Sequence, residues 1–453
     1  MVFIATGDLQ AAKPNFVIIF TDDQGYGDLS CFGSKTIKTP NIDRIASEGR
    51  KFTSFMVASP VCTPSRSALL TGCYPKRVGM HQHVLFPSST KGLNPKEHTI
   101  ADHLKGQGYA TACFGKWHLG HHKEVLPTAN GFDTYYGIPY SNDMNHPDNK
   151  GKPRGGWAGM DILWDDPEST LTKWKTPLFE DEKIVELPVD QRTVTRRYTQ
   201  KSIDFIKANK DKPFFVYLPH SMPHIPLYVP DEVRDPNPKN AYINTIEHID
   251  SEVGRLLKTL DDLKLVDNTY VIYTTDNGPW LQFRHHGGSA GPLREGKGTT
   301  FEGGQRVPCV MRGPGIPVGT VCDELTGTID ILPTIASLTG KALPKGKKID
   351  GMDVSGLWKG TMKKSPRKEF LHYTSRGDIE GLRSGNWKLL VKRARRNNNN
   401  RPPQLHLFDL AKDVGEKNNL AQAKPEIVKE LQERMKALDA EITRNARKPW
   451  FKN

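Results

Sequence analysis

The sequence predicts an α/β fold: a large, mixed but mostly parallel sheet between layers of helices, followed by a smaller α+β domain. Short apolar runs alternate with helical segments over the first three quarters of the chain, a pattern typical of parallel sheets. After about residue 345 the pattern changes to short alternating strands and one amphipathic helix. We therefore expect a larger N-terminal domain at 1–345 and a smaller C-terminal domain at 346–453.

The N-terminal segment predicts a strand followed by a helix. Phe16–Phe20 is an apolar run that ends abruptly in Asp22, Asp23 and glycines, which is typical of a buried strand. A helix should then begin at Pro40, because proline is favoured at the first helical position and Thr39 is a suitable N-cap.

The same alternation continues through the middle of the chain. Residues 99–120 predict a helix, a glycine turn, a strand and a glycine-flanked basic loop, and residues 212–227 predict a strand that enters a loop with proline and histidine. Apolar residues recur at helical spacing over Ala241–Leu260, so that His248 is expected on the surface of this helix. Residues 269–278 repeat the first theme of an apolar strand followed by acidic and amide residues.

The C-terminal domain is expected to combine a small antiparallel sheet with one helix. Residues 369–393 and 404–410 show short strand patterns, and Lys424–Arg444 is amphipathic at helical spacing. The basic, low-complexity segment 392–403 interrupts the strands and is expected to form a mobile hairpin tip.

Polar side chains follow four of the predicted strands. Ligands of such sheets bind at the carboxyl ends of the strands. The residues concerned are Asp22 and Asp23, Lys116, His220 and His224, and Asp276 with Asn277. Because four separate segments place polar groups along one edge, the sequence predicts a functional site there.

Two of these groups have the chemistry of a metal site. Asp22, Asp23, Asp276 and Asn277 offer only oxygen ligands, which favours a hard cation such as Ca²⁺ or Mg²⁺ over zinc. A single Asp-Asn-Gly sequence is commonly just a turn. Two such clusters at matching strand ends favour the metal site.

The charge balance limits the class of partner. Lys and Arg number 64 against 51 Asp and Glu, which gives a formal net charge of +13. This excess suits a polyanionic substrate or simply a well-solvated surface, and no zinc-finger spacing or basic recognition helix supports nucleic acid. No apolar run approaches the roughly 18–20 residues of a membrane span. The first 15 residues lack a basic stretch and do not resemble a signal peptide as they stand.

The six cysteines raise a question about Cys62. None belongs to a C-x-x-C pair, which argues against structural zinc, and they are too sparse for a disulfide framework; we expect Cys73, Cys113 and Cys309 to be packed thiols. If Pro64 is the first or second residue of a helix, Cys62 lies at its N-terminus, where the thiol pKa falls and a thiolate nucleophile is plausible. Soft sulfur nevertheless suits a hard cation poorly, and an oxygen nucleophile would fit better. The residues alone leave this open.

The segment from Cys62 to Gly72, CTPSRSALLTG, resembles the signature of the formylglycine-dependent sulfatases, the arylsulfatase A-like family of the alkaline phosphatase superfamily. The segments TDDQGYGDLSCFG, TPNIDRIASEG, GKWHLG, GIPYSND, TTDNG, GKGTTFEGG and LFDLAKDVGEKNNLA resemble the family in the same order. The resemblance implies an alkaline-phosphatase-like fold. It also implies that a formylglycine-generating or sulfatase-maturing enzyme oxidises Cys62 to an aldehyde, whose hydrate supplies an oxygen nucleophile.

Carried over to this chain, the resemblance implies three sets of site residues. One Ca²⁺ would be held by Asp22, Asp23, Cys62, Asp276 and Asn277. The catalytic residues would be Cys62, Arg66, Lys116, His118, His224 and Lys297, and Ser141 and His220 are substrate-binding candidates. His372 and Arg376 are further substrate-binding candidates because of their place in the segment 372–378, where we expect sugar specificity. His220 is expected on the substrate side or in a structural role.

The implied reaction is the hydrolysis of a sulfate ester. One hydroxyl of the aldehyde hydrate, activated by the cation and Asp276, would attack sulfur, while the cation and basic side chains stabilise the sulfuryl oxygens. His224 would protonate the departing alcohol, and His118 would take a proton from the second hydroxyl to expel sulfate.

The substrate is expected to be an O-sulfated carbohydrate of galactose type, part of a sulfated polysaccharide. Basic character and aromatic-rich loops suit a sugar better than a small aryl ester, and the specificity is expected in 140–180 and 372–378. The alternatives are a formylglycine-dependent phosphonate or phosphate ester hydrolase, and a sulfated-glycan-binding protein without turnover. Export of family members implies a periplasmic or secreted location.

Overall fold

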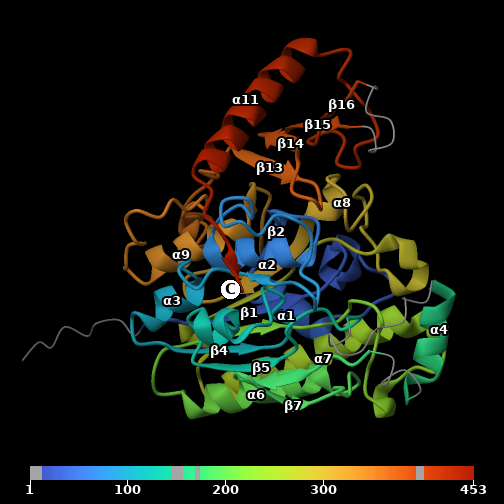
Figure 1. Ribbon diagram of the computed structural model, residues 1–453, viewed down its shortest axis with the longest axis vertical. Helices are drawn as coiled ribbons and strands as arrows, with labels where there is room; N and C mark the ends of the chain where they lie inside the picture. The colour runs from blue at the N-terminus through green and yellow to red at the C-terminus, as the bar shows by residue number, and fades with distance from the viewer. Residues whose placement is uncertain (1–12, 145–156, 169–173, 394–401, 453) are drawn as a thin grey trace, which may run out of the picture.

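An 11-stranded sheet forms the framework of the larger part of the molecule (Figure 1). The computed structural model describes residues 13–144, 157–168, 174–393 and 402–452. The strands of this sheet are β1 (Asn15–Thr21), β2 (Arg50–Met56), β4 (Ala110–Phe114), β5 (Thr134–Gly137), β6 (Leu178–Glu180), β7 (Lys183–Glu186), β8 (Phe214–Pro219), β9 (Thr269–Thr275), β10 (Arg306–Arg312), β11 (Thr320–Cys322) and β12 (Thr326–Gly327). Their order is β11-β2-β10-β9-β1-β8-β4-β5-β6-β7, with β12 beside β2.

The centre of the sheet is parallel, which confirms the predicted class. β1 lies between β8 and β9 and is parallel to both, and β4 is parallel to β8 and β5. β6, β7 and β10 pair in antiparallel fashion. Every residue of β1 is buried, as expected of a strand covered on both faces.

Helices cover both faces of the sheet. Val17 and Ile19 of β1 belong to one apolar cluster with residues of four helices, and Phe16 and Ile18 belong to a second cluster with residues of four others. The first set is α1 (Pro40–Ser47), α4 (Trp157–Asp165), α6 (Val194–Ala208) and α7 (Ala241–Asp262). The second set is α2 (Cys62–Thr71), α3 (Ile100–Lys105), α9 (Ile331–Leu338) and α10 (Ser355–Trp358). This alternation along β1 is the period-two pattern of a strand with two apolar faces.

Helix α1 begins at Pro40 with Thr39 as N-cap, as the sequence predicts. The prediction that His248 lies on the surface of α7 is wrong, because this residue is 6% exposed. Helix α7 packs against α6 as well as against the sheet, so that more than one stripe of α7 is covered. Burial lowers the pKa of His248 to about 4.

Short 3-10 helices connect many of these elements. They are η1 (Tyr26–Asp28), η2 (Ser30–Phe32), η3 (Lys123–Val125), η4 (Pro127–Ala129), η5 (Asp231–Val233), η6 (Pro238–Asn240), η7 (Val266–Asn268), η8 (Leu281–His286) and η9 (Thr328–Asp330). One α-helical turn, α8 (Glu302–Gln305), precedes β10. Among the helices of the described residues, none combines the length and the apolar composition that crossing a bilayer requires.

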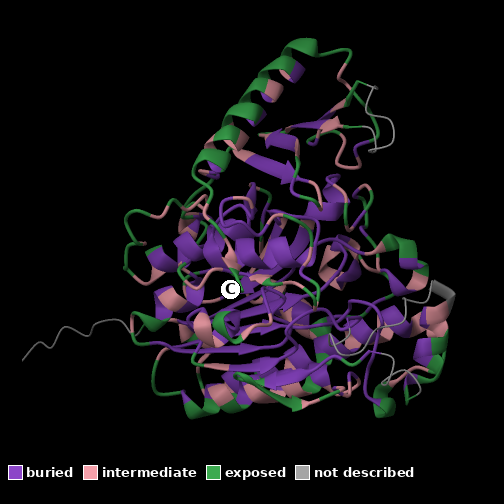
Figure 2. Cartoon of the chain, viewed as in Figure 1, coloured by how far each residue is buried: buried purple, intermediate pink, exposed green. Residues whose placement is uncertain are grey.

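The C-terminal part contains the antiparallel sheet and the helix that the sequence predicts. Strands β13 (Glu369–Tyr373), β14 (Ile379–Ser384), β15 (Trp387–Lys392) and β16 (Gln404–Asp409) pair in sequence order, and α11 (Pro425–Arg444) packs on them. This sheet and α11 project from the larger body, and one side of α11 is exposed (Figures 1 and 2). Most of the basic segment 392–403 lies outside the described residues.

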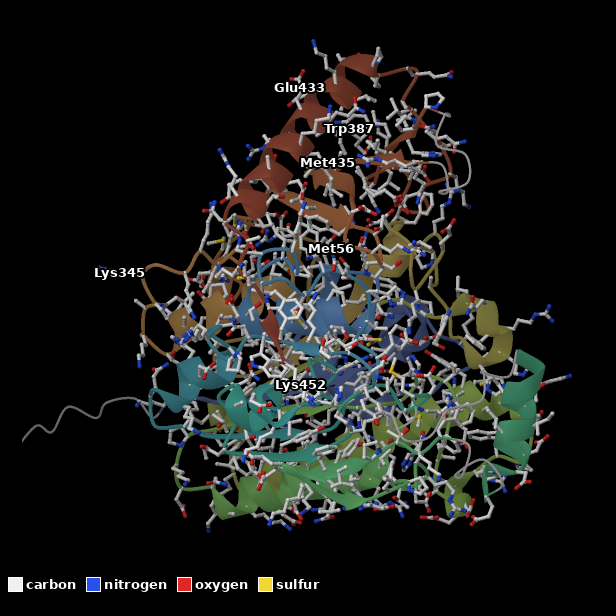
Figure 3. The ribbon with its side chains drawn as sticks, viewed as in Figure 1. Met56, Lys345, Trp387, Glu433, Met435 and Lys452 are labelled. Carbon is white, nitrogen blue, oxygen red and sulfur yellow. The ribbon has the colours of Figure 1, made fainter. Side chains whose placement is uncertain are left out.

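The two parts share an apolar cluster and a returning chain end. Met56, at the end of β2, belongs to the same buried cluster as Met435 of α11, and Figure 3 shows the two side chains on opposite sides of this junction. After α11 the chain returns to the larger body, where β17 (Trp450–Phe451) pairs with β3 (Lys91–Gly92). The sequence did not predict this return.

A buried ion cluster joins β15 to the segment that precedes β10. The Nζ atom of Lys388 lies 2.9 Å from a carboxylate oxygen of Glu302 and 2.9 Å from one of Glu416, and all three side chains are fully buried. Burial favours the neutral form of Glu302, but Lys388 and Arg383 outweigh it and hold the pKa of this carboxyl below its ordinary value. The ammonium group therefore compensates two buried carboxyl groups.

We expect Lys388→Met to lower the free energy of unfolding by about 3–5 kcal/mol, because it removes the ammonium that contacts both buried carboxylates. The remaining contacts of Glu302, with Arg306 at 3.3 Å and Arg383 at 3.8 Å, are longer. The matched control is Lys392→Met on the same strand, since the partly exposed pair with Glu380 contributes at most about 1 kcal/mol. Denaturant unfolding of the two variants measures the difference. Equal effects would contradict the role assigned to Lys388.

Candidate active site

Four segments converge at the carboxyl ends of the central parallel strands. Asp22 and Asp23 follow β1, and Asp276 and Asn277 follow β9, and these two strands end in register at Thr21 and Thr275. Because β8 is parallel to β1 and β4 is parallel to β8, the loops that follow β4 and β8 begin at the same edge of the sheet. The predicted convergence is therefore present in the structure.

Lys116 reaches this edge through an unusual backbone. Gly115 has a φ of +144°, and a Cβ atom added there would lie 1.9 Å from the carbonyl oxygen of Pro219. This position requires glycine. The close approach lets the backbone N–H of Lys116 donate to Pro219 at 2.7 Å and places the lysine side chain over the site.

Cys62 is the first residue of α2, and its side chain faces the carboxylates. Its Sγ atom lies 3.3 Å from Oδ1 of Asp22 and 3.8 Å from Nζ of Lys297, and the residue is 1% exposed. Pro64 is the third helical residue, one position later than the latest predicted. Burial and the carboxylates of Asp22 and Asp276 raise the pKa of the thiol well above its ordinary value. These surroundings therefore disfavour the thiolate nucleophile that the sequence left open.

Arg66 joins the two acidic segments. Its Nε and Nη2 atoms donate to Oδ2 of Asp276 at 3.1 and 2.8 Å, and Nη2 lies 3.4 Å from Asp22. Its Nη1 atom donates to the carbonyl of Lys116 at 2.9 Å. The guanidinium is fully buried, so these contacts fix the relative positions of the ends of β1, β9 and β4.

Two ammonium groups contact the carboxylates from different loops, that of Lys116 after β4 and that of Lys297 before α8. Nζ of Lys116 pairs with Asp22 and donates to Oγ of Ser141 at 3.1 Å. Nζ of Lys297 lies 2.6 Å from Oδ2 of Asp23. Oγ of Ser141 in turn lies 3.3 Å from Nε2 of His224.

His224 and His118 present ring nitrogens to the site in different ways. Nδ1 of His224 lies 2.6 Å from the carbonyl oxygen of Ile225, which fixes a proton on Nδ1, while Nε2 lies 3.7 Å from Oδ2 of Asp23. His118 has a φ of +58°, and its Nε2 lies 2.9 Å from the carbonyl oxygen of Leu85. Its Nδ1 is buried, with no hydrogen-bond partner in the part of the chain that the structure describes. Burial lowers the pKa of His118 well below its ordinary value, so the ring is neutral and Nδ1 carries the lone pair.

The oxygen atoms of this cluster fit a hard divalent cation. Asn277 donates from Nδ2 to Oδ1 of Asp23 at 2.8 Å, and its own Oδ1 atom is buried with no hydrogen-bond partner among the described residues. Ligand atoms of Asp22, Asp23, Cys62 and His224 lie within 4.8 Å of one another. Burial raises the pKa of Asp276 to about 7, with the carboxylate of Asp22 adding to the effect. An orphaned amide oxygen among crowded carboxylates is what a Ca²⁺ or Mg²⁺ ion would satisfy.

Three predicted substrate-binding residues have no side-chain hydrogen bond to this cluster among the described residues. His220 is fully buried, and both of its ring nitrogens lack hydrogen-bond partners; burial lowers its pKa to about 3. His372 is fully buried in β13, where its Nδ1 lies 2.9 Å from Oε1 of Gln305. Arg376 is exposed in the turn that follows β13. Of the four candidates, only Ser141 is joined to the cluster by hydrogen bonds among the described residues.

Trp280 contributes to the site although the sequence did not single it out. Its ring centroid lies 5.4 Å from that of His224, and Nζ of Lys297 lies 4.1 Å from the indole centroid. Phe283 supports the indole edge-on at 4.7 Å, and the indole is partly exposed. The sequence feature that could have identified Trp280 as a site residue is its position three residues after Asn277, in the same loop.

Comparison with known proteins gives the same family from sequence and structure. A model of the family described as Sulfatase matches residues 14–341. Arylsulfatase A of Homo sapiens is 36% identical over 98% of this chain and 92% of its own length. The crystal structure of Ps i-CgsB in complex with k-i-k-neocarrahexaose superposes with a TM-score of 0.80 and 28% identity, covering 97% of this chain and 95% of that one.

A more distant likeness concerns the fold alone. Phosphonate monoester hydrolase of Agrobacterium radiobacter superposes with a TM-score of 0.64 at 20% identity, over 95% of this chain and 96% of that one. The large, mostly parallel sheet with its C-terminal antiparallel subdomain is thus the alkaline-phosphatase-like fold that the sequence predicted.

We expect Ca²⁺ to raise the melting temperature of the metal-depleted protein, because an ion that binds the folded state stabilises it by about 2.7 kcal/mol at a concentration 100 times Kd. Asn277→Ala removes the orphaned oxygen and should reduce this shift. Asn15→Ala is the matched control and should retain the shift, because Asn15 is also buried but its Oδ1 already accepts from the backbone N–H of Phe214 at 3.1 Å. An equal shift in both variants would contradict the proposed ligand role of Asn277.

Proposed function

This chain belongs to the sulfatase family, and from that premise we propose that it hydrolyses O-sulfate esters of carbohydrates by means of a formylglycine made from Cys62 and one bound Ca²⁺. It is a sulfuric ester hydrolase. The observation that carries the proposal is the placement of Cys62 at the start of α2, with Sγ 3.3 Å from Asp22 and 3.8 Å from the ammonium of Lys297.

The surroundings of Cys62 suit an oxygen nucleophile. A buried, neutral thiol is a weak nucleophile and a poor ligand of a hard cation. An aldehyde hydrate at this position would supply a nucleophilic hydroxyl and a second hydroxyl through which sulfate is released. Because Cys62 is 1% exposed in the folded chain, we propose that its maturing enzyme acts before folding is complete.

Asp22, Asp23, Asp276 and Asn277 would hold the Ca²⁺ together with residue 62, and the ion would supply positive charge to the sulfuryl oxygens. Arg66 acts mainly by positioning, since its guanidinium already donates to Asp276 and to the carbonyl of Lys116.

Proton transfer is assigned to the two histidines. The proton of His224 on Nδ1 is held by the carbonyl of Ile225, so Nε2 faces Ser141 and Asp23 and is the atom that would protonate the leaving alcohol. His118 donates from Nε2 to Leu85 and keeps its Nδ1 lone pair, which is the arrangement of a general base. Lys116 and Lys297 would stabilise negative charge on the sulfuryl group from two sides.

Three observations support a carbohydrate substrate. The net charge of +13 favours anionic polymers, the partly exposed Trp280 offers an aromatic face beside His224, and the similar Ps i-CgsB binds k-i-k-neocarrahexaose. We propose a galactose-type sugar as the narrower class. Arg376, exposed in the turn after β13, remains the C-terminal candidate for sugar contact, and much of 140–180 lies outside the described residues.

The organisation and the location of the chain are further parts of the proposal. Residues 1–345 would form the catalytic domain and 346–453 the smaller domain, and the buried cluster that contains Met56 and Met435 ties the two together. A periplasmic or secreted location is proposed because sulfated polysaccharides are extracellular substrates.

The test pairs the mass of the Cys62 tryptic peptide with sulfate release from sulfated sugars and 4-nitrophenyl sulfate. We expect an aldehyde at position 62, turnover that requires it, and faster release from sulfated galactosides than from the aryl ester. Cys62→Ser provides the control, because a serine hydroxyl has no second hydroxyl through which to release sulfate and should not turn over. A fully formed aldehyde that cleaves phosphonate esters but no sulfate ester would overturn the proposal.

Substitution of Trp280 tests its role beside the leaving group. Trp280→Ala should lower kcat/KM by about two- to thirtyfold, the rate equivalent of the ~0.5–2 kcal/mol of a cation–π contact with Lys297. Trp280→Phe keeps an aromatic face and should lose less. If the loss is larger for a sugar sulfate than for 4-nitrophenyl sulfate, the indole also contacts the sugar; unchanged kinetics with both substrates would contradict any role.

A further inference from the structure

A second cluster of potential metal ligands lies outside the candidate active site, where α4 meets η8. Nε2 of His285 lies 2.6 Å from Oδ1 of Asp161, and Nε2 of His286 lies 2.7 Å from the same oxygen atom. Ligand atoms of all three residues lie within 4.8 Å of one another. Neither the family match nor the proposed mechanism uses them.

The backbone turns the two neighbouring histidines to one side. Side chains of adjacent residues normally diverge, yet the rings of His285 and His286 have centroids 4.7 Å apart and both face Asp161. The preceding residue, Arg284, has φ 52° and ψ −118° inside η8, a conformation that costs a non-glycine residue energy. The two imidazoles therefore converge on one carboxylate oxygen despite this backbone conformation.

The chemistry of this cluster differs from that of the active site. Two imidazole nitrogens and one carboxylate suit Zn²⁺ and similar transition metals, whereas the active-site cluster surrounds one imidazole, that of His224, and the side chain of Cys62 with several carboxylates that suit a hard cation. We propose that Asp161, His285 and His286 form a binding site for one Zn²⁺-like divalent cation, with water or a fourth ligand completing the coordination.

The geometry requires only a small adjustment. Tetrahedral ligands about 2.0–2.1 Å from zinc lie about 3.3 Å from one another, so the oxygen of Asp161 would withdraw by about 0.6–0.7 Å from the nitrogens that it contacts at 2.6 and 2.7 Å. This movement is feasible because the side chain of Asp161 is 27% exposed. The side chain of His285 is 25% exposed, so the ion can enter from solvent between these two residues. His286, 1% exposed, is the buried ligand.

The competing arrangement contains no metal. Two neutral imidazoles protonated on Nε2 would donate to one carboxylate oxygen, and the buried Nδ1 of His286, which lacks a hydrogen-bond partner, would carry a lone pair. With a metal on Nε2, the same Nδ1 carries the proton. The two arrangements therefore differ in which nitrogen is protonated, and metal binding separates them.

Such an ion would join two segments near the site. α4 is otherwise anchored by apolar contacts of Met160 and Leu163 and by the hydrogen bond from the indole of Trp164 to the carbonyl of Asp235 at 2.7 Å. η8 begins directly after Trp280. The ion would thus tie α4 to the segment that positions this indole.

The experiment is a titration of metal-depleted, full-length protein with Co²⁺, which reports its ligands by visible absorption. A tetrahedral nitrogen-containing site gives a much stronger band than an all-oxygen site. We expect one equivalent to produce this band, and Zn²⁺ to displace it. His286→Gln and Asp161→Asn should each weaken Co²⁺ binding by at least roughly ten- to hundredfold. Loss of a residue that only hydrogen-bonds to a metal ligand already weakens metal binding by that factor, and these two residues are the proposed ligands themselves.

Two controls separate this inference from the proposed function. His98→Gln alters a different histidine pair, in which Nε2 of His98 lies 3.2 Å from Nδ1 of His103. Among the described residues this pair belongs to no group of three potential metal ligands, so this variant should keep the absorption band. Asp23→Asn alters the active-site cluster and should also keep it, whatever happens to sulfate release. The inference is overturned if the wild-type protein shows no band. It is also overturned if Asp161→Asn binds Co²⁺ as tightly as the wild-type protein does. Because the Asp161 side chain is partly exposed, this variant should fold, and circular dichroism checks that it does.

Discussion

The candidate active site depends on the buried guanidinium of Arg66. This side chain bridges Asp276 and Asp22, which follow two different strands, and donates to the backbone of Lys116, which follows a third. The buried core of the site contains the carboxyl groups of Asp22, Asp23 and Asp276 and the cationic groups of Arg66, Lys116 and Lys297. Equal numbers of opposite charges make this burial tolerable, and a bound divalent cation would leave the site positive, as an anionic sulfate ester requires.

The C-terminal part is connected to the same site through a series of turns. Gly377, with a φ of +82°, lies against His81, where an added Cβ would come within 2.5 Å of the imidazole. Ser375 accepts a hydrogen bond from the backbone of His83 at 3.1 Å, and the carbonyl of Leu85, two residues later, contacts His118. The turn after β13 is therefore packed on the loop that contacts His118, which gives the C-terminal part of the chain a structural role in the site.

Local patterns predicted much of this molecule. The apolar runs of β1 and β9, the helix start at Pro40 and the polar residues after the strands were all correct, because buried parallel strands and proline-initiated helices leave strong local signals. His248 was wrong, because helical periodicity cannot show that a second helix covers a polar stripe. Trp280 was missed for a similar reason: its contacts with His224 and Lys297 join separate segments.

By itself, the sequence determined the fold class, the family and the chemical inventory of the site, since these follow from residue types in a linear order. Only the tertiary structure decided which of those groups act together. It placed Ser141 beside His224 and left His372 buried against Gln305 in a different sheet. It also set the protonation of Cys62 and His118, because the pKa of a side chain depends on its burial and on the charges around it, which the order of residues does not specify.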